Sequence, residues 1–235
     1  MLQWLEKHRV GFALSVLSMV ALIGMFVTSG EKVFGPIRGT NIEPLLLALG
    51  WTNTIAFNLC LGYLTSVFFW LLVVHVPERQ RRKLLRESLS RRYADFKHNT
   101  IQICSWAGNL QLSTMDVDEL TEKSKFKDYF HRQRWYDVAN GLEANQDYVD
   151  GLLLEMQLLA DELTYILNNV VIQDVEVHGL FKQLTERVYR MKYDPNYTAD
   201  PVKYICQFLW ELHANWSFVV GYMPNDPVTD KIARV

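Results

Sequence analysis

The chain has 235 residues, with 24 Lys or Arg, 26 Asp or Glu and a formal net charge of −2. The charge is uneven: residues 78–97 carry eight basic and three acidic side chains, whereas residues 98–235 carry twelve basic and twenty acidic ones. Such an acidic body argues against broad nucleic-acid binding. The three cysteines, Cys60, Cys104 and Cys206, show no paired spacing, which predicts buried, reduced thiols.

Two long apolar runs occupy the N-terminal third. Residues 10–29 and 55–76 contain no Asp, Glu, Lys or Arg. Each run can cross a hydrocarbon core of about 30 Å as a helix. The alternative for the first run is a secretory signal peptide, because Lys7 and Arg9 precede it, but it is longer than the usual apolar region of a signal. The sequence therefore predicts a two-span transmembrane helical hairpin over residues 1–76.

The basic stretch after the second run predicts the orientation of these spans. Positive charge next to a span normally stays in the cytoplasm. We therefore expect cytoplasmic termini, membrane lipids as partners and a bacterial inner membrane as the location. The connection between the spans, residues 30–54, would then lie on the external side of the membrane. Within it, Glu43 and Pro44 precede the apolar residues 45–49, which predicts a short interfacial helix, with Trp51 following it.

Small and polar residues recur at helical spacing inside both runs. Spacings of three and four place such residues on one helix face, where another helix can approach closely. They are predicted to fasten the hairpin or several copies of it, and the alternative is a role in lining or gating a pore. The residues are Gly11, Ser15, Ser18, Asn58, Gly62 and Ser66.

The remainder is predicted to be helical, so the expected fold class is all-α with a helical bundle after the spans. Residues 77–111 form a basic juxtamembrane helix with an apolar stripe, and residues 112–235 form an acidic cytosolic domain. In that domain a helix start is expected at Ser113. Further helices are expected over residues 145–169, 175–192 and 201–221, with loops at 194–201 and 223–227 and no sheet. The helix over 201–221 is apolar enough to predict a core helix or an oligomer interface.

Motifs for catalysis are scarce. The chain has no Walker loop, GxGxxG, GxSxG or HExxH motif, and its six histidines are scattered. We therefore expect no enzyme, no cofactor and no metal site. One pattern stands apart, because five residues separate Arg92 from His98.

This spacing resembles the R-x4-6-H motif of HEPN-type ribonucleases, all-helical dimers in which Arg and His of both subunits surround an RNA phosphodiester. The resemblance, which covers eight residues, implies that His98 would move a proton and Arg92 would hold the phosphate. The chain departs from the family in two ways. Tyr93 occupies the position directly after the arginine, where the family usually has a different polar residue, and the motif lies early in the soluble part instead of late. The enzymatic alternative is thus a membrane-anchored HEPN-like ribonuclease.

A second basic cluster lies in the acidic domain. Concentrated positive charge can hold an anionic ligand such as a nucleotide. The alternative is a solvated helix face balanced by Glu119, Glu122 and Asp128. The cluster consists of Lys123, Lys125, Lys127, His131, Arg132 and Arg134.

The order of two spans, a basic helix and a cytosolic helical domain resembles the two-span membrane effectors of bacterial antiviral defence, signalled by CRISPR or cyclic-oligonucleotide systems. The resemblance implies a homo-oligomer whose cytosolic domain binds a messenger while the spans perturb the membrane. Such coupling requires the ligand to bind one state more tightly than the other. The contrasting hypothesis is an anchor or scaffold that docks a partner protein.

Overall fold

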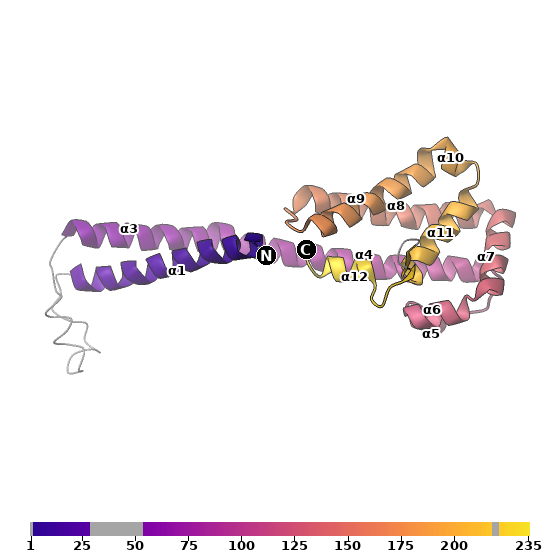
Figure 1. Cartoon of the computed structure of the whole chain (residues 1–235), viewed down its shortest axis with the longest axis horizontal. Coiled ribbons are helices and arrows are strands. Elements are labelled where there is room, and N and C mark those ends of the chain that lie inside the picture. Colours follow the sequence, from indigo (N-terminus) through magenta and orange to yellow (C-terminus); the bar gives the residue numbers. More distant parts are fainter. Residues whose placement is uncertain (1, 29–53, 218–220) are drawn as a thin grey trace. The chain divides into compact units, whose positions relative to one another are not determined.

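The computed structural model describes residues 2–28, 54–217 and 221–235, including side chains from residue 12 onward (Figure 1). The described chain is almost entirely helical, which confirms the all-α class. It forms two compact units, Met1–Gln80 and Arg81–Val235. The predicted external helix over residues 43–49 and Trp51 lie outside the described residues.

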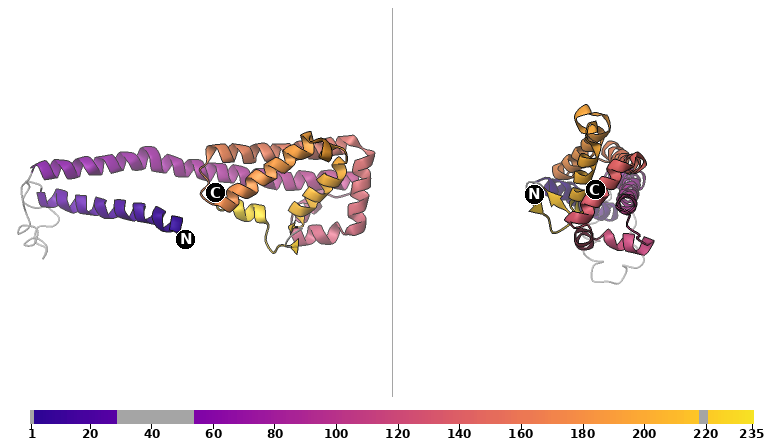
Figure 2. Two further views of the ribbon diagram at one scale, coloured as in Figure 1. Left: turned by 45° about the horizontal axis from the view of Figure 1, so that its top comes forward. Right: turned by 90° about the vertical axis from the view of Figure 1, so that its right-hand side faces the viewer.

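The first unit consists chiefly of two apolar helices that lie side by side. They are α1 (Leu2–Thr28) and α3 (Thr54–Trp70) (Figures 1 and 2). The two helices approach closely at Gly24, where an added Cβ would lie 3.0 Å from the Cys60 Sγ. The pairing buries little, because α3 has no buried residue and Ala21 alone is buried among the described side chains of α1.

Length and composition weakly indicate membrane association of this unit. Among the described residues, the continuous helical stretch Thr54–Ala107 contains one segment long and apolar enough to cross a membrane. Helix α1 contributes the shorter apolar stretch Phe12–Thr28. Large apolar side chains on both helices face outward; Phe12 is 73% exposed and Ile55 is 79% exposed.

A π-helical turn, η2 (Leu71–His75), follows α3 directly and leads without a break into α4 (Val76–Ala107). Pro77 explains why the turn widens here. A proline within an α-helix has no N–H to donate and its ring clashes with the carbonyl four residues earlier. The wider turn, in which the Val76 N–H donates to the Leu71 carbonyl, accommodates it without ending the helix.

The second unit begins within α4 and adds eight more described helices, six of which begin at a side-chain cap. Ser113 and Asp116 form a capping box at the helix start that the sequence predicts, and Asn145 and Asp174 cap the next long helices. The helices are α5 (Thr114–Leu120), α6 (Lys123–Tyr129), α7 (Arg132–Ala144), α8 (Gln146–Asn169), α9 (Val175–Tyr193), α10 (Pro195–Thr198), α11 (Pro201–His213) and α12 (Pro227–Ile232).

Helix α11 lies at the centre of this unit. It contacts α6, α7, α8 and α9, and its residues Ile205, Phe208 and Leu209 are fully or almost fully buried. The prediction of a core helix is therefore confirmed. Helices α8 and α9 lie alongside each other and supply further core residues such as Leu152 and Phe181 (Figures 1 and 2).

The structure corrects the predicted end of this helix. The expected helix over residues 201–221 stops at His213, because Asn215 adopts a left-handed backbone conformation with φ of 49°. A small antiparallel pair follows, β1 (Trp216–Ser217) and β2 (Gly221–Tyr222), so the expectation of no sheet is also wrong. In addition, the expected loop at 194–201 contains α10.

Candidate functional site

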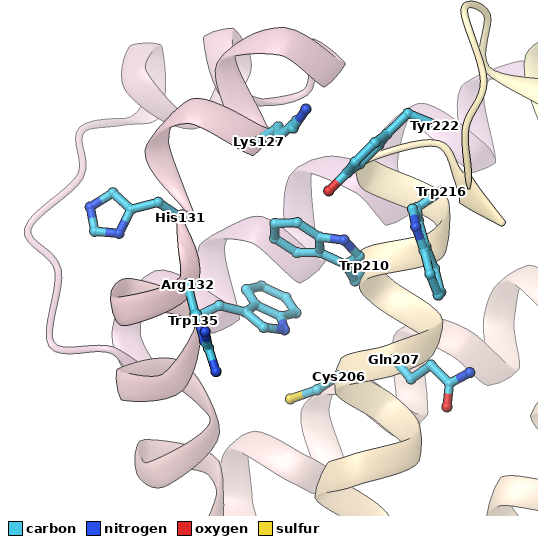
Figure 3. Close-up of a pocket in the computed structure, with 9 residues that line it drawn as sticks. All are labelled: Lys127, His131, Arg132, Trp135, Cys206, Gln207, Trp210, Trp216 and Tyr222. Atoms are coloured by element: carbon cyan, nitrogen blue, oxygen red, sulfur yellow. The ribbon is translucent and has the colours of Figure 1, made fainter. Parts of the chain in front are cut away.

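The second unit contains a cavity of about 520 Å³ between α6, α7, α11 and the strand pair (Figure 3). An adjoining cavity of about 690 Å³ shares four of its lining residues, His131, Arg132, Trp135 and Cys206. Both volumes fall in the range of about 300–1,000 Å³ that is usual for small-molecule sites. This region is therefore the candidate binding site.

Aromatic rings form most of the apolar surface of the smaller cavity. Trp135 comes from α7, Trp210 from α11, and Trp216 and Tyr222 from the paired strands. The indoles of Trp135 and Trp210 lie 5.3 Å apart between centroids, with their planes tilted by 55°. Both rings also contact Phe126, which is buried in the core. The aromatic wall is thus supported from behind by the core.

Positive charge lies at the same cavity. Lys127 Nζ lies 3.9 Å from the centroid of the Tyr222 ring, a cation–π contact. Arg132 and His131 are exposed, and within the described part of the chain neither side chain makes a hydrogen bond or an ion pair. In Figure 3 the His131 ring points away from the indoles, which places it at the edge of the site. Arg132 is thus the guanidinium most available to a ligand.

The other three residues of the predicted basic cluster are engaged elsewhere. Lys123 donates to the carbonyl of Met223. Lys125 pairs with Glu119 at 3.2 Å, and this carboxylate raises the lysine pKa. Arg134 donates to the Tyr129 carbonyl at 3.3 Å, and its Cζ lies 4.2 Å from the centroid of that ring. These contacts leave Lys127, His131 and Arg132 as the members of the cluster that line the cavity.

The remaining lining residues carry no charge at neutral pH. Burial raises the pKa of the Cys206 thiol to about 12, with further contributions from Glu143 and Asp200, so the group stays protonated. Gln207 donates to Glu211 at 2.9 Å. No Asp or Glu is among the residues that line either cavity. The site therefore favours an anion over a cation.

The aromatic wall continues into the interior as far as α4. His213 stacks on Phe126 with 4.8 Å between centroids and is nearly parallel to Phe96 at 6.2 Å. Its Nε2 lies 3.0 Å from the Thr100 Oγ1. Because that hydroxyl gives its own hydrogen to the Phe96 carbonyl, it accepts from the Nε2–H, and Nδ1 is left without a partner among the described residues.

The pKa of His213 lies well below its ordinary value, because burial disfavours the charged ring and Lys97 adds repulsion. The same lysine pairs with Asp226 at 3.3 Å. The hydroxyl of Tyr93 also donates to Asp226, at 3.0 Å, and burial raises the pKa of that tyrosine well above its ordinary value. The neutral His213 of α11 thus contacts α4, and Lys97 of α4 is paired with Asp226.

Arg92 and His98, the residues of the HEPN-like pattern, contact different elements. Arg92 pairs with Glu155 of α8 at 2.5 Å, and the other carboxylate oxygen of Glu155 accepts from Asn99 at 3.1 Å. The His98 Nδ1 lies 2.8 Å from Asp118 of α5. The structure does not bring the two side chains into one site within the chain.

Most of the described small and polar residues predicted to pack the spans are exposed. Ser18 is partly buried, and Ser15 is exposed. Asn58, Gly62 and Ser66 are all exposed, and a Cβ added to Gly62 would meet nothing within 4 Å. Gly11 lies in α1, and its surroundings are outside the description.

Comparisons with known proteins produced no match to a family model, a curated protein or a solved structure. Among the described residues, no group of three or more His, Cys, Asp or Glu could hold a metal ion. Sequence reasoning missed the aromatic residues of the site. Their periodicity on α7 and α11 indicates core packing, and only the fold shows that Trp135, Trp210 and Trp216 line a cavity.

Proposed function

We propose that the protein is an oligomeric membrane sensor or effector whose second unit binds an anionic ligand and whose first unit acts on the membrane through two spans. The observation that carries the proposal is the cavity itself, where the Arg132 guanidinium adjoins an aromatic wall with no acidic lining residue. A guanidinium without a partner suits a carboxylate or phosphate, to which it can donate two parallel hydrogen bonds.

The outward-facing apolar surface of α1 and α3 supports membrane insertion. Leaving a large apolar side chain in water costs about 1.5–3 kcal/mol relative to burial, and many such side chains on these helices are exposed. A lipid environment removes that cost. The basic stretch after Val76 supports cytoplasmic termini, as in a bacterial inner membrane.

Helix α4 provides a physical route for coupling. It follows η2 and α3 without a non-helical residue, and its buried residues Phe96 and Thr100 belong to the core that supports the cavity. A ligand could shift the membrane segments only if it binds one state of this core more tightly than the other. Exposed Asn58, Gly62 and Ser66 would then serve contacts between copies, since polar groups at membrane depth usually face protein or water.

Native mass spectrometry of the full-length protein released from mild detergent tests the proposal. We expect an oligomer that carries a small anionic adduct, and we expect the Arg132→Ala variant to lose the adduct. Lys125→Ala is the matched control, because Lys125 is a nearby cation that Glu119 already neutralises outside the cavity. An adduct retained by Arg132→Ala, or a ligand-free monomer, would contradict the proposal.

Two alternatives remain predictions. An inert anchor for a partner protein should keep its activity when both spans are exchanged for unrelated ones. A HEPN-like ribonuclease should lose RNA cleavage in His98→Ala, a mild change because the partner Asp118 is largely exposed. Arg92→Ala is the less specific test, since it also breaks the pair with Glu155.

A further inference from the structure

We infer that the ligand of the cavity is a single nucleotide, that is, a planar aromatic base joined to a phosphate-bearing sugar. The inference rests on the proposed function and deepens it by naming the class of anion. It follows from the chemistry of the lining residues, in which aromatic faces and a cation adjoin (Figure 3).

The aromatic residues account for the base. Trp135 and Trp210 are inclined to each other by 55°, so their rings do not stack face to face. Trp216 and Tyr222 are cross-strand partners and bring two further rings to the same cavity. Stacking on such side chains is the usual way in which proteins hold a base without reading its sequence.

The charged residues account for the phosphate. Arg132 makes no side-chain hydrogen bond or ion pair within the described part of the chain, so a purely apolar ligand would leave its guanidinium unused. A cationic ligand, which aromatic rings alone would attract, is repelled by Arg132 and Lys127. An aromatic anion satisfies both kinds of lining residue.

The distribution of charge favours one nucleotide over a nucleic-acid strand. A strand needs a track of free cations along its backbone. Beyond the cavity, Lys123, Lys125 and Arg134 are engaged by Met223, Glu119 and Tyr129, and residues 98–235 carry eight more acidic than basic side chains. The cavity volume of about 520 Å³ also lies within the small-molecule range.

Isothermal titration calorimetry of the full-length protein in lipid nanodiscs tests the inference. The probes are the four ribonucleoside monophosphates AMP, GMP, CMP and UMP, together with adenosine and ribose 5-phosphate. We expect at least one monophosphate to bind, and we expect both adenosine and ribose 5-phosphate to bind roughly tenfold or more weakly, because each lacks one half of the recognised chemistry.

Two variants test separately how the phosphate and the base of the ligand are recognised. Arg132→Ala should weaken the monophosphate roughly tenfold and leave adenosine unchanged. Trp216→Ala should weaken both the monophosphate and adenosine roughly tenfold and leave ribose 5-phosphate unchanged. Tyr165→Ala is the matched aromatic control, because Tyr165 is 50% exposed on α8 and lines neither cavity, and it should change nothing. Circular dichroism of each variant verifies folding.

Other outcomes overturn the inference in distinguishable ways. Equal affinity for ribose 5-phosphate and the monophosphates would mean a plain anion site, which leaves the proposed function intact. A single-stranded RNA decamer that binds more tightly than any monophosphate, with a steep salt dependence, would indicate a polymer ligand. If no probe binds and native mass spectrometry finds no adduct, the proposed function fails as well.

Discussion

Helices α1 and α3 of the first unit expose most of their large apolar side chains, whereas α8 and α11 of the second unit bury most of theirs. Ile55 on α3 is 79% exposed, while Leu152 on α8 and Ile205 on α11 are fully buried. All four helices are rich in apolar residues, but residues 10–29 and 55–76 carry no charged side chain, whereas α8 and α11 do. The difference teaches that the second unit packs its apolar side chains into a core of its own, while the exposed apolar surface of the first unit weakly indicates membrane association.

Separating the two units tests this comparison most directly. We expect residues 81–235 to be soluble and to unfold cooperatively in water, because their apolar residues form one core. We expect residues 1–80 to aggregate unless detergent is present. Analytical ultracentrifugation with and without detergent measures both. A monomeric, detergent-free first unit would break the comparison.

A pair of glycines tests whether the second unit is tightly packed. A Cβ at Gly141 of α7 would overlap the backbone carbonyl of Ala107, whereas one at Gly179 of α9 would meet nothing within 4 Å. We expect Gly141→Ala to lower the free energy of unfolding by about 3 kcal/mol or more. Gly179→Ala should raise it by about 0.5–1 kcal/mol through helix propensity. Urea unfolding of both variants gives the answer, and equal effects would contradict close packing at Gly141.

The ion pair between Arg92 and Glu155 tests the contribution of charge to the same core. Their side chains are 22% and 14% exposed, so removing one partner leaves the other largely buried. We expect Arg92→Ala to lower the free energy of unfolding by about 2–4 kcal/mol. The neighbouring Arg91 is exposed, and Arg91→Ala serves as the control with an expected change below about 0.5 kcal/mol. Similar losses of unfolding free energy in both variants would show that the ion pair between Arg92 and Glu155 does not stabilise the core.

His213 predicts a pH dependence of the second unit. Its pKa is depressed in the folded state, so the unfolded chain takes up the proton first as pH falls. Stability should therefore be retained above the unfolded pKa of about 6.5 and decline below it, by up to about 1.4 kcal/mol per pH unit.

Chemical denaturation between about pH 5.5 and 7.5 measures this slope, since 6.5 is the ordinary histidine pKa. The His213→Gln variant should lose the slope, although the substitution also changes the packing against Phe126. His178→Asn, at an exposed position, should keep it. A slope that persists in His213→Gln would assign the dependence to other groups.

The smallest expected effect concerns Gly62 of the first unit. Because nothing lies within 4 Å of a Cβ there, Gly62→Leu should leave the stability of a single chain in detergent within about 0.5 kcal/mol of the wild type. If copies pack through this face, the substitution should instead change the oligomer mass in native mass spectrometry. An unchanged oligomer would place the contacts between copies elsewhere.

Much of the helical pattern could be predicted because short-range chemistry determines it. Asn145 and Asp174 cap their helices with their own side chains, and the apolar spacing of α8 matches its buried face. The end of α11 could not be predicted, since the apolar Trp216 continues the helical period past the turn at Asn215. The break between α5 and α6 at Thr121 and Glu122 could not be predicted either, since neither residue is a Pro or Gly that would end a helix.

The sequence predicted the cations of the site but not its aromatic residues. Clustered cations are readable along the chain, and Lys127, His131 and Arg132 do line the cavity. Which cations are already engaged depends on partners brought by the fold, such as the Met223 carbonyl for Lys123 and the Glu119 carboxylate for Lys125. The aromatic wall depends on the meeting of α7, α11 and the strand pair, which local spacing does not encode.

The close pairing of Trp135 and Trp210 has an optical consequence. Two indoles at 5.3 Å and an oblique angle of 55° couple their electronic transitions and should produce an exciton couplet in the far-ultraviolet circular dichroism spectrum. Any molecule that wedges between or against these rings would alter the sign or size of that band. The native chain thus carries its own label for occupancy of the cavity, without an added dye.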